Sequence, residues 1–239
     1  MRRGAHPRAA RAAALIALAL AVPRGPAVAE ALRATDDRGR IVDWSAGLLL
    51  ASGLGVADRH APSPEVARPA ARERAIAEAT RALIAAARLL PVAGGRPLGE
   101  LVDEPALARA AASASILSAD PLVDGSWRVQ LGLPLERLRQ AAQGARAAPD
   151  EGDRGIPLLV VRAPATVTPQ LGLAIGDQAT RWRGATLWAK GDPAGVPLSA
   201  AALGKAPSVK VEEVDADGLR ISKVRGVSDA TLFVVVLGK

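Results

Sequence analysis

The segment from Gln143 to Gly155 divides this chain of 239 residues into two parts with different sequence patterns. It reads QGARAAPDEGDRG and contains acidic residues, Gly, Pro and Ala but almost no large apolar side chain. Such a segment buries too little apolar surface to join a core, which is typical of a linker between domains. We therefore predict two small domains, residues 30–142 and 156–239, joined by a linker over residues 143–155.

The first predicted domain begins with an apolar stretch from Ile41 to Val56. Glycines occur in it at Gly47, Gly53 and Gly55, and a glycine inside a strand pattern indicates a bend or a bulge. The stretch therefore predicts either two short strands or one bent strand.

A long helix is predicted to follow this stretch. Ser63 provides an N-cap and Pro64 a first helical residue. Apolar residues then recur at helical spacing: Ile76, Ala79, Leu83, Ala87 and Leu90. Because Pro69 lacks an amide hydrogen, we expect the regular helix to begin only near Arg68.

A second helix and a hairpin complete most of the first domain. Acidic residues at the start of Glu104–Ala114 suit the dipole of a helix. Asp124 and Gly125 then separate two apolar stretches, residues 115–122 and 126–133, as the turn of a β-hairpin does.

Residues 134–143 predict a third, short helix with Leu135 and Leu138 facing inward. The resulting order of elements is β-α-α-β-β-α. We therefore predict an α+β fold, in which helices pack on one face of a small antiparallel sheet.

From Ile156 onward the sequence pattern predicts strands alone. The predicted strands cover residues 156–161, 171–175, 185–189, 208–214, 219–224 and 231–237. The clearest pair flanks the turn from Asp215 to Gly218, where Asp-Ala-Asp-Gly separates two stretches rich in valine and isoleucine. We predict a small all-β domain, either a sandwich or a barrel.

The N-terminus has the pattern of a removable export signal. Arginines precede an apolar run from Ala12 to Val22, prolines follow, and Ala27 and Ala29 form a small-residue cleavage motif. We predict that residues 1–29 are a signal peptide. Its removal takes away five arginines and lowers the formal net charge from +7 to +2, a balance that disfavours nucleic acid as a partner.

The chain contains no cysteine, which excludes disulfide bonds, thiolate metal sites, thiol nucleophiles and a lipid anchor at a lipobox cysteine. The N-terminal apolar run is also shorter than the roughly 20 residues that span a bilayer, and no later stretch reaches that length. We expect an exported, periplasmic protein of a Gram-negative cell with no integral membrane span, associated with the outer membrane without a lipid anchor.

No group of residues predicts a catalytic or metal site. His60 lies near Asp58 and Ser63 in the sequence, but a catalytic triad is a spatial arrangement, and a solvated histidine beside a helix cap is the simpler interpretation. With no second histidine nearby and no cysteine, a zinc site is excluded.

Two further motifs resemble known binding loops but are incomplete. Gly53-x-Gly55 lacks the third glycine of a dinucleotide-binding loop. Asp215-x-Asp217-Gly218 lacks the later ligands of a calcium loop. We predict no cofactor, no metal and no enzymatic activity, although a pair of carboxylates brought together by folding stays possible for a hydrolase.

Trp182, Arg183 and Trp188 form the strongest candidate contact surface. They lie on a predicted hairpin, and tryptophan and arginine are over-represented at binding hot spots. The alternative is that the tryptophans fill a core poor in other aromatic residues.

Two segments carry a resemblance to a known family. Asp43–Gly55 reads DWSAGLLLASGLG, and Ala61–Ala75 reads APSPEVARPAARERA ahead of an alanine-rich helix. With the hairpin at Ser115–Leu133, they resemble bacterial envelope lipoprotein-like proteins related to a Helicobacter membrane-associated lipoprotein and to the N-terminal domain of the flagellar H-ring assembly protein. The resemblance implies an envelope location and a role in flagellar or outer-membrane assembly, and it supplies no catalytic residue.

We therefore expect a non-catalytic exported protein that acts by protein–protein contact, with an envelope protein or a second copy as its partner. The alternative is an exported hydrolase or carbohydrate-binding protein that uses acidic residues together with Trp182 and Trp188.

Overall fold

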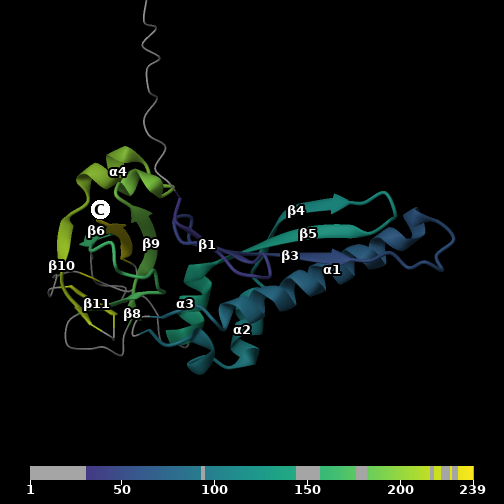
Figure 1. Ribbon diagram of the computed structural model, residues 1–239, viewed down its shortest axis with the longest axis horizontal. Helices are drawn as coiled ribbons and strands as arrows, with labels where there is room; N and C mark the ends of the chain where they lie inside the picture. Colours follow the sequence, from purple (N-terminus) through teal and green to yellow (C-terminus); the bar gives the residue numbers. More distant parts are fainter. Residues whose placement is uncertain are drawn as a thin grey trace, which may run out of the picture.

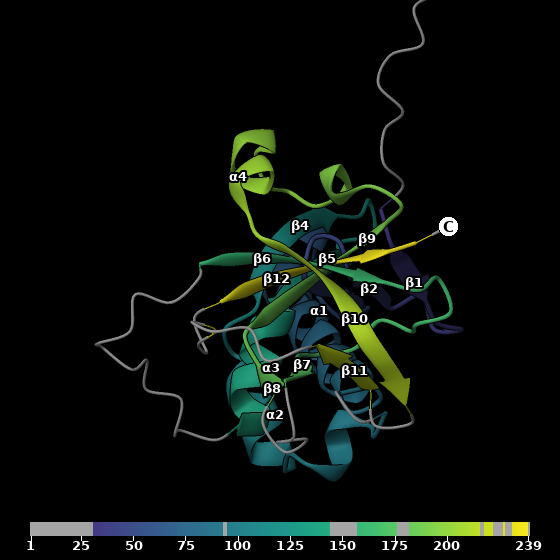
Figure 2. The ribbon, with the colours of Figure 1, turned by 90° about the vertical axis from the view of Figure 1, so that its left-hand side faces the viewer.

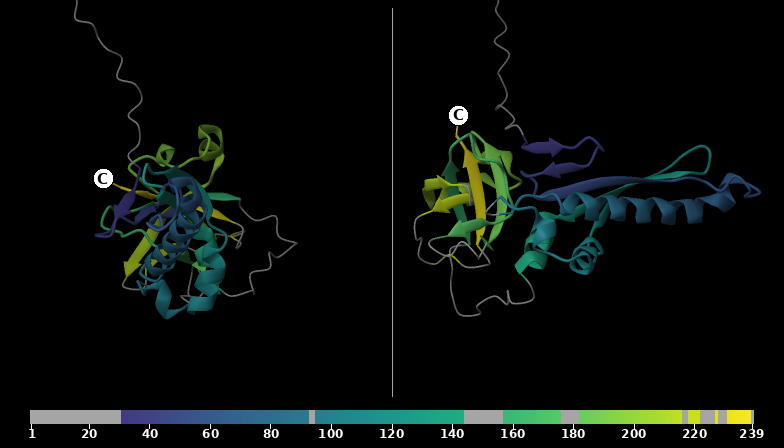
Figure 3. Two further views of the ribbon diagram at one scale, coloured as in Figure 1. Left: turned by 90° about the vertical axis from the view of Figure 1, so that its right-hand side faces the viewer. Right: turned by 60° about the horizontal axis from the view of Figure 1, so that its bottom comes forward.

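The computed structural model describes residues 31–92, 95–143, 157–175, 182–215, 218–221, 227 and 231–238. They form two lobes that lie end to end, each built on one sheet (Figure 1). The N-terminal lobe, residues 31–143, extends into a long arm made of β3, α1, β4 and β5, which points away from the C-terminal lobe, residues 157–238 (Figure 3). The predicted signal peptide, with Ala27 and Ala29, and the predicted linker beyond Gln143 lie outside the described residues.

The N-terminal lobe contains a five-stranded sheet in which all neighbouring strands are antiparallel. Its order is β1 (Arg33–Thr35), β2 (Ile41–Asp43), β3 (Leu48–Gly55), β5 (Trp127–Pro134) and β4 (Ser115–Pro121). Between β2 and β3 the chain turns at Gly47, whose φ of +68° favours glycine. The stretch from Ile41 to Val56 thus forms two strands, which is one of the two alternatives predicted, although β3 has eight residues and only β2 is short.

Helix α1 (Pro64–Ala87) packs on β3 and β5 through its smallest residues. Ala67, Ala71, Ala75 and Ala79, spaced four residues apart on one face, are all buried. Opposite them lie Gly53 and Gly55, and a Cβ on either glycine would overlap the backbone carbonyl oxygen of Ala75 or Ala71. The helix therefore approaches the strand so closely that only glycine fits beneath it.

The prediction of bends at Gly53 and Gly55 is therefore wrong. Both residues lie inside the regular strand β3, and neither has a positive φ. Glycine is needed there for the close approach of a neighbouring backbone, which is the other common reason for glycine in a strand.

Helix α1 also begins earlier than expected, at Pro64, and continues through Pro69. Pro69 is exposed, so the carbonyl group that would have accepted its missing hydrogen bond lies toward solvent. Water can satisfy that carbonyl, which lowers the cost of the proline.

From β3 onward the elements of this lobe run strand, helix, helix, strand, strand, helix, but β1 and β2 precede them, so the predicted order β-α-α-β-β-α is not confirmed for the lobe as a whole. After the short 3-10 turn η1 (Leu98–Glu100), helix α2 (Glu104–Ala111) is capped by Asp103, whose side chain accepts a hydrogen bond of 2.8 Å from the Ala106 amide. The β4–β5 hairpin turns at Gly125, where φ is +84°. Helix α3 (Leu135–Gln143) then buries Leu135 and Leu138 as predicted.

The C-terminal lobe contains a seven-stranded sheet of mixed direction. Its order is β8 (Trp182–Arg183), β7 (Leu173–Ile175), β11 (Gly218–Ile221), β10 (Ser208–Asp215), β6 (Leu158–Ala163), β12 (Leu232–Leu237) and β9 (Ala185–Lys190). Strand β12 runs parallel to both β6 and β9, and β6 runs parallel to β10. The predicted hairpin at Asp215–Gly218 is confirmed as the antiparallel pair of β10 and β11.

This sheet curls back on itself. Strands β8 and β9 stand at opposite ends of the strand order, yet only Gly184, with φ +71°, separates them in the chain. Across the gap, the Trp188 indole nitrogen donates a hydrogen bond of 3.1 Å to the Gln170 carbonyl, just before β7. The arrangement resembles a barrel in which Gly184 joins the two end strands, and Figure 2 shows β6, β12 and β10 crossing the view along their length in front of the arm.

The parallel strands β6, β12 and β9 of the C-terminal lobe are buried on both faces. Leu159, Phe233 and Val235 face the main core, whereas the alternate residues Val160 and Val234 pack in a second cluster that includes Leu203 of α4. That helix, α4 (Ala200–Lys205), and the 3-10 turn η2 (Pro193–Gly195) cover the outer face. The prediction of an all-β second domain is therefore not confirmed, because a helix completes it.

The two lobes share one continuous core. A single cluster of buried apolar side chains runs from Leu83 of α1 through Trp44 to Trp188 and Phe233. Backbone contacts reinforce the junction, since the Trp188 amide donates to the Trp44 carbonyl at 3.1 Å and the Ser45 hydroxyl donates to the Trp188 carbonyl at 2.7 Å.

Candidate functional surface

Large apolar side chains reach the solvent mainly on the arm. Within the described residues, those exposed there are Leu54, Val56, Val66, Ile116, Leu117 and Val123. One further exposed side chain, Leu89, lies just beyond α1, and none of this group lies in the described part of the C-terminal lobe. We call the six arm residues the arm surface. Val123, at the tip of the β4–β5 hairpin, is 98% exposed.

The geometry of the arm explains this exposure. Helix α1 covers one face of β3 and β5, so alternate strand residues face away from it onto an open side. Leu54 lies on that open side. On β4, the strand beside β5, a register shift between Ile116 and Ser118 places Leu117 over Gly132. A Cβ on Gly132 would lie 2.8 Å from the Leu117 side chain.

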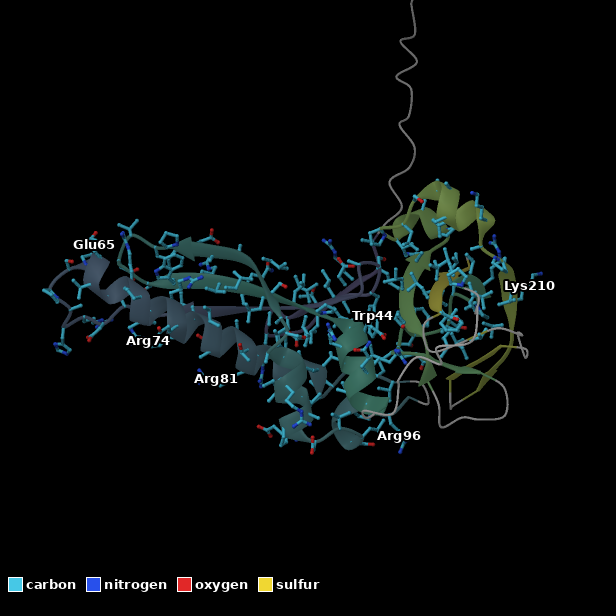
Figure 4. The ribbon with its side chains drawn as sticks, turned by 180° about the vertical axis from the view of Figure 1, so that it is seen from behind. Trp44, Glu65, Arg74, Arg81, Arg96 and Lys210 are labelled. Atoms are coloured by element: carbon cyan, nitrogen blue, oxygen red, sulfur yellow. The ribbon has the colours of Figure 1, made fainter. Side chains whose placement is uncertain are left out.

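Hydrogen-bond donors without acceptors also lie near the far end of the arm. The Arg72 guanidinium stands 5.9 Å above the centre of the Trp127 ring. The Trp127 indole nitrogen and the Arg68 Nε atom are both buried and have no hydrogen-bond partner. Figure 4 shows the start of α1, marked by Glu65, at the end of the arm most distant from Trp44 at the junction.

The structure separates the three residues of the predicted contact surface. Trp188 is fully buried, so it belongs to the core and is unavailable to a partner, in agreement with the alternative weighed from the sequence. Trp182 and Arg183 lie in β8, which pairs with β7, whereas Trp188 lies in β9, which pairs with β12. The predicted hairpin between them is therefore wrong, and the side chains of Trp182 and Arg183 lie outside the described part of the chain.

The sequence neighbours His60, Asp58 and Ser63 form a surface turn. The Asp58 carboxylate accepts a hydrogen bond of 2.9 Å from the backbone amide of His60, and both residues are exposed. Ser63 is the N-cap of α1, although its hydroxyl makes no capping hydrogen bond. The turn supports the interpretation of His60 as a solvated histidine, whereas Ser63 occupies the cap position without the expected side-chain hydrogen bond.

No metal-ligand cluster occurs among the residues that the structure describes: no three His, Asp or Glu side chains there are placed to hold an ion. Asp215 closes the β10–β11 turn opposite Gly218, and Asp217 lies outside the described residues. Likewise, none of the helices described is both long and apolar enough to cross a membrane.

Comparison of the chain with protein-family models and with curated proteins gives no match. The arm surface was not predicted from the sequence, because its residues lie on β3, α1 and β4 and on the connecting segments at Val56 and Val123. The sequence signal for it is the stripe of buried alanines in α1, because a helix that packs through its smallest residues leaves little room beneath it for large apolar side chains.

Proposed function

We propose that this protein is a non-catalytic, exported protein of the bacterial envelope that acts by protein–protein contact through its arm. One observation carries the proposal: the exposed large apolar side chains of the described residues gather on the arm surface. Such gatherings on a protein surface are typical of interaction sites.

The chemistry of the arm indicates what a partner must offer. Val66 and Val123 reach the solvent, so a partner must offer apolar side chains to them. We propose that an envelope protein provides such a segment.

The N-terminal export pattern supports a periplasmic location, and the absence of cysteine supports release without a lipid anchor. A role in flagellar or outer-membrane assembly rests on the family resemblance of Asp43–Gly55 and Ala61–Ala75. The alternative of a carbohydrate-binding protein loses one of its two tryptophans, because the Trp188 indole is buried and cannot stack on a sugar.

Site-specific photo-crosslinking in living cells tests the proposal. A photoreactive residue at Val123 or Val66 should give a crosslink to one defined envelope protein, whereas the same residue at Ala201, exposed on α4, should give none. Val123→Asp should abolish a crosslink formed from Val66. Equal crosslinking from the arm and from Ala201, or recovery of uncrosslinked monomer alone, would contradict a contact function of the arm.

A further inference from the structure

A pocket of about 380 Å³ opens where the two lobes meet, away from the arm surface. Three segments that are distant in the sequence form it: the β1–β2 hairpin, the end of α1 with the residues after it, and the segment at Thr168 and Pro169. Its volume lies within the range of roughly 300–1,000 Å³ that is usual for small-molecule sites.

The walls of the pocket are almost entirely apolar. Its apolar side chains include Leu32, Val42, Trp44, Ala86, Leu89 and Leu90. Trp44 and Leu90 belong to the shared core, so these walls are fixed by the packing of both lobes. Leu89 is different, because it lines the pocket and is also 68% exposed. A site with such walls selects an apolar ligand.

The charged residues of the lining are two arginines and one aspartate: Arg33, Arg40 and Asp36. Arg40 forms an ion pair with Asp36 and is almost buried, so this pair is internally neutral. Arg33 bonds through its Nε atom to Asp43, at 2.6 Å.

Asp43 itself is not part of the lining and is buried, and its other carboxylate oxygen accepts a hydrogen bond of 2.8 Å from the Ala46 amide. The Arg33 side chain, in contrast, is 61% exposed. A ligand in the pocket therefore meets the guanidinium of Arg33 rather than the carboxylate that balances it.

We propose that this pocket binds a single acyl chain that carries an anionic headgroup. The apolar walls accept the hydrocarbon chain, and Arg33 at the opening attracts the negative group, so both parts of an amphiphile are matched. The inference goes beyond the contact function of the arm, and it uses no residue of the arm surface.

Leu89 provides a matched pair of variants because it is exposed and lines the pocket. Titration calorimetry of the full chain with sodium laurate, kept below its micelle concentration, should show saturable binding. Leu89→Asp places a negative charge at the pocket and should weaken binding about tenfold, whereas Leu89→Lys should leave it within about threefold of the unsubstituted protein. Ala34→Trp, at an exposed lining position of β1, should block the pocket without disturbing the core.

The headgroup and the site have separate controls. Dodecyltrimethylammonium, which has the same chain length and a cationic headgroup, should bind at least about tenfold more weakly than laurate. Laurate should also change the tryptophan fluorescence, and Trp44→Phe should remove that change, because Trp44 lines the pocket. No saturable laurate binding, equal binding of both amphiphiles, or equal affinity of Leu89→Asp and Leu89→Lys would each overturn the proposal.

Discussion

The arm and the C-terminal lobe bury their apolar residues in different ways. In the arm, α1 and β3 meet through Ala71, Ala75, Gly53 and Gly55, and backbones pack almost directly on each other. The C-terminal lobe instead encloses large side chains such as Trp188 and Phe233 together with branched aliphatic residues. The same aromatic-poor composition, 2% of the residues, thus supports two kinds of core.

The difference has a consequence for the surface. A small-residue interface removes little apolar area per residue from water, so it contributes less stability than a filled core. It also leaves no space beneath the helix for the large apolar residues of the arm, which face the solvent instead. We therefore expect the arm to be sensitive to added volume and the C-terminal lobe to removed volume.

The largest effect is expected from Trp188→Ala. The substitution removes a fully buried side chain at the junction of both lobes, and it should lower the free energy of unfolding by about 3–5 kcal/mol. Urea unfolding followed by circular dichroism measures this loss. Trp188→Phe, which keeps most of the volume but loses the hydrogen bond to Gln170, should cost clearly less. Equal losses for the two variants would show that filled volume is not what stabilises this lobe.

Gly55→Ala adds volume to the core of the arm, whereas Trp188→Ala removes volume from the C-terminal lobe. A single added methyl group would overlap the Ala71 carbonyl and force α1 away from β3, at a cost of about 1–3 kcal/mol. Unfolding curves recorded by fluorescence and by circular dichroism would show whether the arm separates before the rest of the molecule. A loss below about 0.5 kcal/mol would mean that the arm core is not closely packed.

Asp36→Asn tests the contact between β1 and β2 and should have a smaller effect. Partial burial raises the pKa of Asp36, but hydrogen bonds from the Arg40 amide and side chain and from the Arg38 amide outweigh this and hold that pKa below its ordinary value of 3.8. Because the folded pKa is lowered, the stabilisation is complete above pH 3.8 and is lost as the pH falls through the folded pKa.

The variant should therefore lose on the order of 1 kcal/mol at pH 7, from the hydrogen bonds to the carboxylate, and the difference from the unsubstituted protein should shrink in acid. Urea unfolding at several pH values measures it. A difference that stays constant down to pH 2 would contradict the role of the ionised carboxylate.

The smallest effect is expected from Gly204→Ala, the counterpart of Gly55→Ala. Gly204 lies in α4, where a Cβ would meet no atom within 4 Å, so alanine should stabilise the protein by about 0.5–1 kcal/mol. Thermal unfolding should show a slightly raised midpoint. If both glycine substitutions destabilise equally, the contrast between a crowded and an open glycine position is wrong.

The local elements of the N-terminal lobe could be predicted from the sequence because their signals are local. The period of apolar residues defined α1, and Asp124 with Gly125 marked the β4–β5 hairpin. The role of Gly53 and Gly55 could not be predicted, since a glycine that bends a strand and a glycine that admits a helix look the same until the two elements are paired.

The C-terminal lobe shows a second limit. Its parallel pairing joins strands distant in the chain, so no turn between neighbours marks it, although the continuous apolar runs at 158–161 and 233–237 are typical of strands buried on both faces. The burial of Trp188 agrees with the interpretation of the tryptophans as core residues, but the strands that cover it could not be predicted, for the same reason. When both faces of a strand are covered, the alternation of residues no longer separates inside from outside.

The position of β12 has a consequence for how the molecule assembles. This strand is the latest of the described strands in the chain, yet it lies between β6 and β9. A chain that emerges from a ribosome or a translocation channel with its N-terminus first can pair β3 with β5 early, whereas β6 and β9 must wait for Leu232–Leu237. The arm is thus ready to fold while the C-terminal lobe still exposes unpaired strand edges, so truncation before Leu232 should release a folded arm attached to an aggregation-prone remainder.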